Sequence, residues 1–300
     1  MKRFMRVGIL TALATTILCA DVSYRETINL KSGMLVDMLQ KMASNPALGK
    51  AGDSLKQVLE GQTYDVYLKG NQMARIGSHS SYIYDMDAGT MTLINHDRQT
   101  YSVQTFDEMS QQFQHMQQKM GKAIGDLQFD AKVSKTGQTQ QIGGETATET
   151  VITLTAKQSS EQGQMAATVH SWLVPMNPVR QQVRDFQKRL GEKVSSAMLT
   201  GVSPMLSFAG SGLSAALKEM SKIDGGYPVL SIATVTGSLG AGNPLAALAA
   251  MSGGAATDPN APLIVTESRY DNFVEGAANE SKFAVPAGYK PEKAPQFSAH

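Results

Sequence analysis

Residues 62–103 decide the fold, and they read QTYDVYLKGNQMARIGSHSSYIYDMDAGTMTLINHDRQTYSV. Short runs rich in Tyr, Val, Ile and Thr follow one another in this block, which runs from Gln62 to Val103. They are separated by turn residues: Gly70 with Asn71, Asp87 to Gly89, and His96 to Arg98. Short strands joined by such tight turns pair with their neighbours in sequence. The block therefore predicts an antiparallel meander.

Further strand-like runs lie on both sides of this block. Residues 22–30 have the alternation of an edge-type strand. One face would carry Tyr24, Glu26, Ile28 and Leu30, and the other Arg25, Thr27 and Asn29. Downstream, β-branched and aromatic residues are enriched in residues 127–135, 147–157, 165–174, 227–235 and 263–274. The chain is therefore expected to form a mainly antiparallel sheet.

Four helices are expected between these strands, because apolar residues recur there every three or four positions. They cover residues 34–42, 106–124, 178–200 and 203–221. Proline suits a first helical turn, which places Pro178 and Pro204 at the starts of the last two. The apolar stripes of the helices need a partner surface, and the apolar face of the sheet is the obvious one. The predicted class is α+β in a single domain, residues 21–300.

Residues 237–262 are expected to form a flexible insert, because they are rich in Gly and too long for a hairpin loop. The run LAALAAM follows Asn243 and Pro244 and offers two helical turns. Its Leu245 and Leu248 would then rest over the mouth of a binding site. The alternative is a spacer without a role.

The first twenty residues have the layout of a secretory signal peptide. Lys2, Arg3 and Arg6 precede an apolar run, Val7 to Leu18, and a small residue, Ala20. The apolar run is too short to remain in a bilayer as an anchor, so no stable membrane span is expected. Cleavage near Ala20 would leave a periplasmic or secreted protein that begins at Asp21.

Cys19 is the only cysteine, and Leu18 before it fits a lipoprotein cleavage box badly. Loss of Cys19 with the signal removes disulfides and thiolate metal sites from the mature chain. Loss of Lys2, Arg3 and Arg6 from the 27 basic residues leaves 24 against 26 acidic ones. A chain with this balance has no electrostatic reason to bind nucleic acid.

Two motifs imitate binding sites. Asp85, Asp87 and Gly89 resemble the start of a calcium loop, but His96 occupies the place of the required glutamate, so a hairpin turn is favoured. The glycines of GSGLSAAL at residues 210–217 imitate a dinucleotide fingerprint, yet the acidic partner comes too early in the sequence. Neither a metal nor a cofactor is predicted.

No catalytic residue is predicted either. Ser78 or Ser80 beside His79 suggests a nucleophile and its base, but neighbours on a strand point to opposite faces. The other histidines show no spacing typical of a metal pair. A hydrolase is therefore the least favoured function, and the chain is not expected to be an enzyme.

Several pieces of the chain occur in an order that resembles a family of bacterial exported proteins. They span roughly residues 22 to 291 and read YLKGNQMARI, SYIYDMDAGTMTLINHDRQTYSV, IGGETATETVITLTA, HSWLVP, DGGYPVLSIATV and SKFAVPAGYK. The family is usually filed as a domain of unknown function and is similar to the LolA and LppX type of envelope lipoprotein carrier. The resemblance implies an open, curved antiparallel sheet, a half-barrel, whose concave face is covered by helices.

Methionines are frequent in the expected helices, and methionine lines surfaces that adapt to an apolar guest. The alternative is that they fill gaps in the core. With the resemblance, this composition favours a periplasmic carrier for a lipid, a lipoprotein or another apolar ligand. A non-catalytic module that binds a partner protein of the envelope is the second hypothesis. The predicted cavity residues are Met38, Met116, Phe186, Leu190, Leu245 and Leu248.

Overall fold

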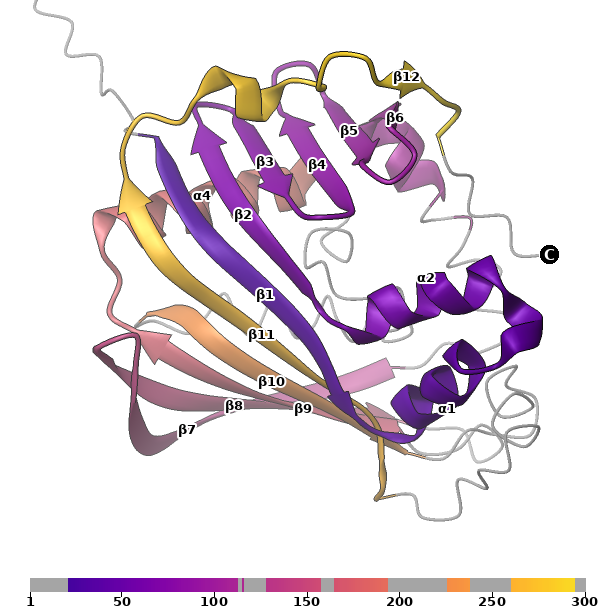
Figure 1. The fold of residues 1–300 in the computed structure, drawn as a ribbon. Coiled ribbons are helices and arrows are strands. Elements are labelled where there is room, and N and C mark those ends of the chain that lie inside the picture. The colour runs from indigo at the N-terminus through magenta and orange to yellow at the C-terminus, as the bar shows by residue number, and fades with distance from the viewer. Residues whose placement is uncertain are drawn as a thin grey trace, which may run out of the picture.

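Twelve strands form one sheet in a computed structural model that describes residues 21–112, 115, 128–157, 165–193, 226–237 and 260–294. The strand order is β12-β6-β5-β4-β3-β2-β1-β11-β10-β9-β8-β7 (Figure 1). The sheet is open, and a few helices accompany it. The predicted α+β class is therefore confirmed. The predicted signal peptide, residues 1–20, lies outside the described residues.

The predicted meander is confirmed. Each of its strands pairs antiparallel with the next one in the sequence, and the runs of aliphatic and aromatic residues form the strands. Their bounds are β2 (Gln62–Lys69), β3 (Gln72–Ile76), β4 (Ser80–Asp85), β5 (Thr90–Asn95) and β6 (Thr100–Thr105).

The first strand, β1 (Val22–Ser32), lies in the interior of the sheet. It pairs with β2 on one side and with β11 on the other, both antiparallel. The prediction of an edge-type strand is therefore wrong, because the alternating pattern does not tell which strand pairs from far along the sequence. The second half of the sheet consists of β7 (Gln128–Ile142), β8 (Glu145–Lys157), β9 (Met165–Val174), β10 (Tyr227–Gly237) and β11 (Pro262–Glu275).

The ends of the predicted insert 237–262 belong to strands. β10 extends to Gly237, β11 begins at Pro262, and Thr236 pairs with Pro262. The insert is therefore shorter than expected, because its first residue, Gly237, belongs to β10 and its last residue, Pro262, belongs to β11. Residues 238–259, which include Leu245 and Leu248, lie outside the described residues.

The first three predicted helices are present in the described residues, the fourth, residues 203–221, lies outside them, and one further helix was not predicted. The structure has α1 (Met34–Ala43), helical residues 106–112, and α4 (Pro178–Lys193), while residues 194–225 lie outside the described part. The helix α2 (Lys50–Leu59), which follows the short 3-10 helix η1 (Pro46–Leu48), was not predicted. Pro46 and the glycines at 49 and 52 predict a loop at residues 45–52, and this prediction is wrong, because η1 and the start of α2 occupy these residues. No helix among the described residues is long and apolar enough to cross a membrane.

Two helices pack at opposite ends of β1 and β11. α4 contacts the cluster that contains Val22 and Phe273, whereas α1 packs on Leu263 and Ile264 near the other end of these strands. We call the first group the α4 cluster and the second the α1 cluster. The buried members of the α4 cluster are Val22, Tyr24, Tyr64, Val66, Leu68, Met73, Tyr84, Met86, Met91, Phe106, Met109, Ala147, Val174, Val183, Phe186, Leu190, Tyr227 and Val229.

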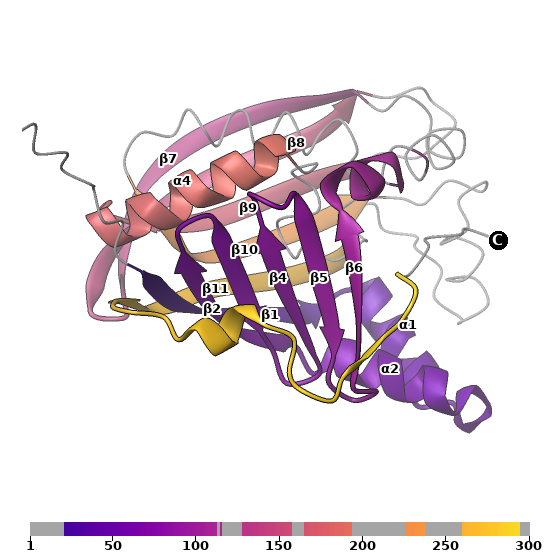
Figure 2. The ribbon, with the colours of Figure 1, turned by 90° about the horizontal axis from the view of Figure 1, so that it is seen from above.

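The chain after β11 crosses the other side of the meander. We call residues 276–294 the strap. It contains the 3-10 helix η3 (Glu280–Phe283) and, near its end, the short strand β12 (Lys290–Pro291). β12 is parallel to β6. Figure 2 shows α4 and the strap on opposite sides of β2–β6. We call the side towards α4 the inner face and the side under the strap the outer face. The strap side chains Phe283, Val285 and Tyr289 pack there on the outer cluster, Ala74, Ile83 and Ile94.

Candidate functional site

A buried ion pair joins Glu26 on β1 to Arg75 on β3 across the inner face of the meander. Arg75 Nη2 lies 2.7 Å from Glu26 Oε2, and each side chain is only 7% exposed. Both residues alternate with outward-facing neighbours, so the strand pleat directs them inward. Glu26 is buried because β1 has a strand on each side. A buried charge is costly unless it is paired, so this pair is the least expected feature of the core.

Tyrosines surround the pair. The guanidinium carbon of Arg75 lies 4.4 Å from the ring centroid of Tyr64 and 5.8 Å from that of Tyr82. Burial raises the pKa of the Tyr84 and Tyr270 hydroxyl groups beside the pair; Arg75 opposes this rise at Tyr84, and Glu26 adds to it at Tyr270. Nε of Arg75 has no hydrogen-bond partner, and Nη2 meets Glu26 without the geometry of a hydrogen bond. The site therefore keeps unused donor capacity inside the core.

The charges of this cluster are set by burial. Burial raises the pKa of the Tyr64 hydroxyl to about 12, and it also raises the pKa values of Tyr24, Tyr227 and Tyr270. Burial alone lowers the pKa of Arg75, but the Glu26 carboxylate and the nearby tyrosines raise it above its usual value. At neutral pH the Arg75–Glu26 ion pair therefore lies within a ring of neutral tyrosine hydroxyl groups.

Helix α4 lies over this end of the sheet. Its Val183, Phe186 and Leu190 are at most 1% exposed and pack in the α4 cluster. Gln187 Nε2 lies 3.5 Å from the hydroxyl of Tyr24, at the limit of a hydrogen bond. The amphipathic sequence of α4 thus places its apolar stripe on the sheet and next to the tyrosines.

Polar contacts hold α4 at both ends. At the first turn, the guanidinium of Arg180 forms an ion pair with Glu145 and donates to the backbone oxygen of Pro175. The Arg180 guanidinium holds the pKa of Glu145 below its usual value. At the other end, Arg189 donates to Asn71 at 2.9 Å and Lys193 donates to the backbone oxygen of Met86 at 2.7 Å. The helix therefore bridges two distant turns of the sheet.

The structure brings together only part of the predicted cavity. Phe186 and Leu190 lie side by side on α4. Met38 lies in the α1 cluster with Leu263 and Ile264, near the opposite end of β1. The remaining predicted residues lie outside the described part of the chain: Met116, Leu245 and Leu248.

Sequence reasoning missed Glu26 and Arg75. Glu26 occupies the same phase as Tyr24 in the alternation of β1, and Arg75 stands between Ala74 and Ile76 in a short apolar run. A charged residue in the inward phase of a strand was the available signal. It was not recognised because β1 looked like an edge strand, where such a residue meets water.

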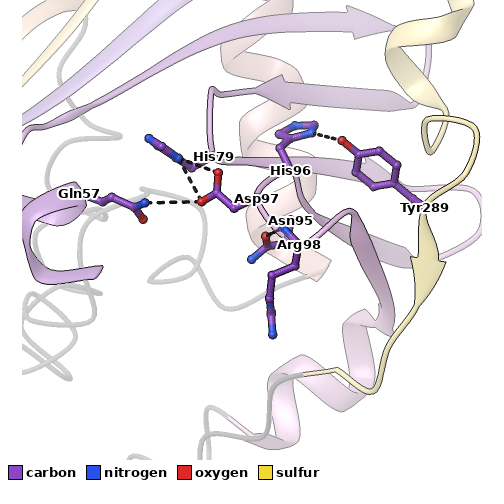
Figure 3. Close-up of polar contacts among 7 residues, drawn as sticks. All are labelled: Gln57, His79, Asn95, His96, Asp97, Arg98 and Tyr289. Atoms are coloured by element: carbon purple, nitrogen blue, oxygen red, sulfur yellow. Dashed lines mark hydrogen bonds and ion pairs between the residues drawn. The ribbon is translucent and has the colours of Figure 1, made fainter. Parts of the chain in front are cut away.

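The outer face carries a second polar cluster at the edge of the meander (Figure 3). Ser81 Oγ lies 2.6 Å from His96 Nε2, and His96 Nδ1 lies 3.0 Å from the hydroxyl of Tyr289 on the strap. The exposed His79 contacts Asp97 at 3.0 Å, and Gln57 donates weakly to the same carboxylate at 3.5 Å.

This arrangement resembles a nucleophile, a base and an orienting group. Ser81 is 0% exposed, however, so its hydroxyl does not reach a substrate. A neutral tyrosine hydroxyl also orients a histidine more weakly than a carboxylate does. Ser80, proposed from the sequence as a partner of His79, is not joined to it, because His79 Nδ1 contacts Asp97 instead. The cluster therefore ties the strap to the sheet.

A third polar cluster lies between β7, β8 and β9. His170 Nδ1 is 2.8 Å from Oε1 of the buried Glu149, and the hydroxyl of Thr136 donates to Oε2 at 2.7 Å. The hydrogen bonds from His170 and Thr136 hold the pKa of Glu149 below its usual value. Each oxygen of this carboxylate is thus satisfied within the sheet.

The motif DMDAGT forms the hairpin turn between β4 and β5. Oδ1 of Asp85 accepts hydrogen bonds from the backbone amides of Asp87 and Ala88, each at 2.9 Å. The backbone amide of Ala88 is the main cause that lowers the pKa of Asp85. The interpretation as a turn is confirmed. In the part of the chain that the structure describes, no group of three or more His, Cys, Asp or Glu side chains is placed to hold a metal ion.

No protein-family model matches the chain, and neither does any curated protein sequence.

Proposed function

We propose that this protein is a periplasmic binding or carrier protein for a lipid, a lipoprotein acyl chain or another apolar ligand, held between the sheet and α4. The observation that carries the proposal is the construction of α4. Its apolar side lies on the inner face, while polar contacts through Arg180, Arg189 and Lys193 hold it at both ends. On this proposal the sheet acts as a half-barrel whose concave face is covered by helices.

The driving force for binding is the removal of apolar surface from water, about 25 cal/mol per Å². An acyl chain that replaces the side chains of Val183, Phe186 and Leu190 would meet the same aliphatic and aromatic residues of the sheet. The polar contacts of α4 are mostly partly exposed, and such contacts contribute about 1 kcal/mol or less each. On this proposal, contacts of this strength let α4 move away from the sheet when a ligand enters, and together they bring it back when the ligand leaves.

The Glu26–Arg75 pair would give the ligand an orientation. Nε of Arg75 is a buried donor without an acceptor, and a buried unsatisfied donor costs about 1–3 kcal/mol. A carbonyl or headgroup oxygen would supply the missing acceptor. The proposed ligand therefore has an apolar chain and a polar end, as lipids and acylated proteins do.

The test is native mass spectrometry of the mature protein, purified from the periplasm without detergent and followed by lipid extraction. We expect an additional apolar mass that denaturation releases. Leu190→Asp should abolish binding of a fluorescent fatty acid, because an unpaired charge in an apolar site costs several kcal/mol. Lys188→Asp is the matched control, since Lys188 is exposed on the same helix. Equal binding by the two folded variants would remove α4 from the site.

Met38→Asp tests whether the α1 cluster belongs to the same site. Met38 packs with Leu263 and Ile264, near the end of β1 opposite to α4. If the ligand extends along the whole strand, this variant also loses binding. If a folded Met38→Asp variant binds normally, the site is confined to the α4 cluster.

The second candidate function is a non-catalytic module that binds another protein of the envelope. The near-complete burial of Val183, Phe186 and Leu190 favours it, because α4 then covers the inner face with its own side chains. A folded mature protein that carries no extractable ligand and binds no fatty acid would support this function and end the carrier proposal.

A further inference from the structure

The two edges of the sheet differ in how they resist pairing with another strand. The edge strand β7 carries Lys132 and Lys135, and its ladder to β8 is irregular between Lys135 and Thr139, where Gly137 has φ +77°. Charged residues and irregular ladders discourage edge-to-edge pairing. The strand β6 reads TYSVQT and has no charge, no proline and no irregular step in its ladder to β5. Such a segment pairs readily with a copy of itself.

One residue of β6 is open on this edge. Val103 is 52% exposed, and no strand among the described residues pairs with β6 beyond Tyr101 on the side away from β5. The carbonyl of Tyr101 faces β12, so the alternation of the backbone places the N–H and C=O of Val103 on the same edge. The N–H of Thr105 is occupied, because it donates to Oε2 of Glu108 at 2.8 Å.

The strap covers the rest of the edge with a segment that ends the sheet. The amides of Lys290 and Glu292 donate to the carbonyls of Gln99 and Tyr101 at 3.0 and 2.7 Å. In a strand, alternate amides point to opposite sides, so the nitrogen between them faces away from β6. That nitrogen belongs to Pro291, which has no N–H. The open edge of β12, which faces away from β6, therefore offers no backbone donor at Pro291.

The end of the strap is held by few contacts. Tyr289 meets His96, and Arg98 donates to Glu292 at 2.9 Å. The hydroxyl groups on both sides of His96 can each donate or accept, so the link does not require one protonation state of the ring. Phe283 and Val285, nearer to β11, pack on the outer cluster as Tyr289 does, and their contacts do not involve residues 290–292. The last residues of the strap can therefore leave while the remainder stays bound.

We propose that residues 289–292 are an edge cap that keeps β6 from pairing with β6 of a second copy of this chain. When the cap is displaced, two copies pair antiparallel about a two-fold axis at Val103. The amide of each Val103 then donates to the carbonyl of the other, and the amide of each Tyr101 donates to the carbonyl of Thr105 in the other copy. The same patch serves both copies, so the contact closes as a dimer.

The experiment uses the full mature chain and compares Glu292→Pro with Glu292→Gln by size-exclusion chromatography with light scattering. Glu292→Pro deletes the amide that donates to Tyr101, whereas Glu292→Gln keeps the amide and loses only the charge. We expect Glu292→Pro to have twice the molar mass of the single chain, as a dimer does, and Glu292→Gln to have the molar mass of a monomer. Adding Val103→Lys to Glu292→Pro should restore the monomer, because each copy then places a cation on the axis.

A folded Glu292→Pro protein that remains monomeric at every concentration would overturn the proposal, and so would a dimer that Val103→Lys does not dissociate. If Glu292→Pro does not fold, Tyr289→Ala combined with Arg98→Ala decides the question, because this variant releases the same end of the strap through its side chains. This double variant has the same two expected results.

Discussion

The two faces of the meander each bury a polar cluster, but by different chemistry. On the inner face the cluster is a full ion pair, Glu26 and Arg75, whose side chains are 7% exposed. On the outer face it is a hydrogen-bonded chain of Ser81, His96 and Tyr289, which contains no carboxylate or guanidinium and ends at the strap. Charges need a partner to remain inside, whereas hydroxyl groups and an imidazole satisfy one another without a net charge. The inner face should therefore be far more sensitive to substitution.

The largest effect is expected for Arg75→Met. It leaves Glu26 as an uncompensated buried charge, and breaking one partner of such a pair costs about 3–5 kcal/mol. Urea unfolding measures the loss. Arg25→Met is the matched control, because Arg25 pairs with Asp65 on the outer face and both side chains are about half exposed, so the loss should be below about 1 kcal/mol.

The double variant Glu26→Gln with Arg75→Met removes the orphaned charge and should recover much of the stability lost in Arg75→Met. If Arg75→Met and Arg25→Met have equal free energies of unfolding, burial does not distinguish the two pairs, and the comparison of the faces fails.

A smaller loss is expected on the outer face from Ile94→Ala. Ile94 is 1% exposed and lies under the strap with Ala74 and Ile83, so its truncation leaves a cavity. Substitutions of this kind cost about 2–5 kcal/mol, and we expect about 2–3 here, because the strap side chains that cover Ile94 can settle into part of the cavity. Unfolding monitored by urea gives the number. A loss larger than that of Arg75→Met would reverse the predicted order of the two faces.

Tyr289→Phe tests the hydrogen bond of the strap with little change of packing. It removes the hydroxyl that meets His96 at 3.0 Å and keeps the ring, whose centroid lies 5.9 Å from that of the imidazole. The net contribution of such a bond is about 1 kcal/mol. Hydrogen exchange of the amides of Lys290 and Glu292 should become faster, while that of β2 should not change. Equal exchange in the variant and the parent would show that the hydroxyl does not hold the strap.

The smallest effect is a pH dependence at the exposed pair of His79 and Asp97. The hydrogen bond from His79 holds the pKa of Asp97 below its usual value of 3.8. A carboxyl with a lowered pKa in the folded state contributes stability above its unfolded pKa, and this contribution is lost as the pH falls through the folded value. Asp97→Asn should therefore flatten the dependence of unfolding on pH below 3.8 and leave neutral stability nearly unchanged. An unchanged slope would show that His79 does not act on this carboxylate.

Local patterns predicted the strands and several helices well. The meander from β2 to β6 has β-forming runs and turn residues whose chemistry fits the turns, so neighbouring strands pair without help from distant segments. The helix at residues 34–42 and the start of α4 at Pro178 follow from spacing and from proline. The helix α2 was missed because Pro46 and two glycines suggest a loop, although apolar residues further on pack it against α1 and β1.

The candidate site was predicted less well, for a different reason. The apolar stripe of α4 correctly placed Phe186 and Leu190 in the core, and their predicted role in binding a ligand stays a prediction. Glu26 and Arg75 were not recognised, since nothing in residues 22–30 tells that β11 pairs with β1 from more than two hundred positions away.

The amino-acid sequence by itself predicted the strands other than β12, the helices α1 and α4, and which strands of the meander pair with one another. Only the tertiary structure decided that β1 lies inside the sheet, that Glu26 therefore meets Arg75 away from water, and that the strap covers the edge of β6. The physical reason is that strand periodicity depends on adjacent residues, whereas burial depends on which distant segments arrive on each side of a strand.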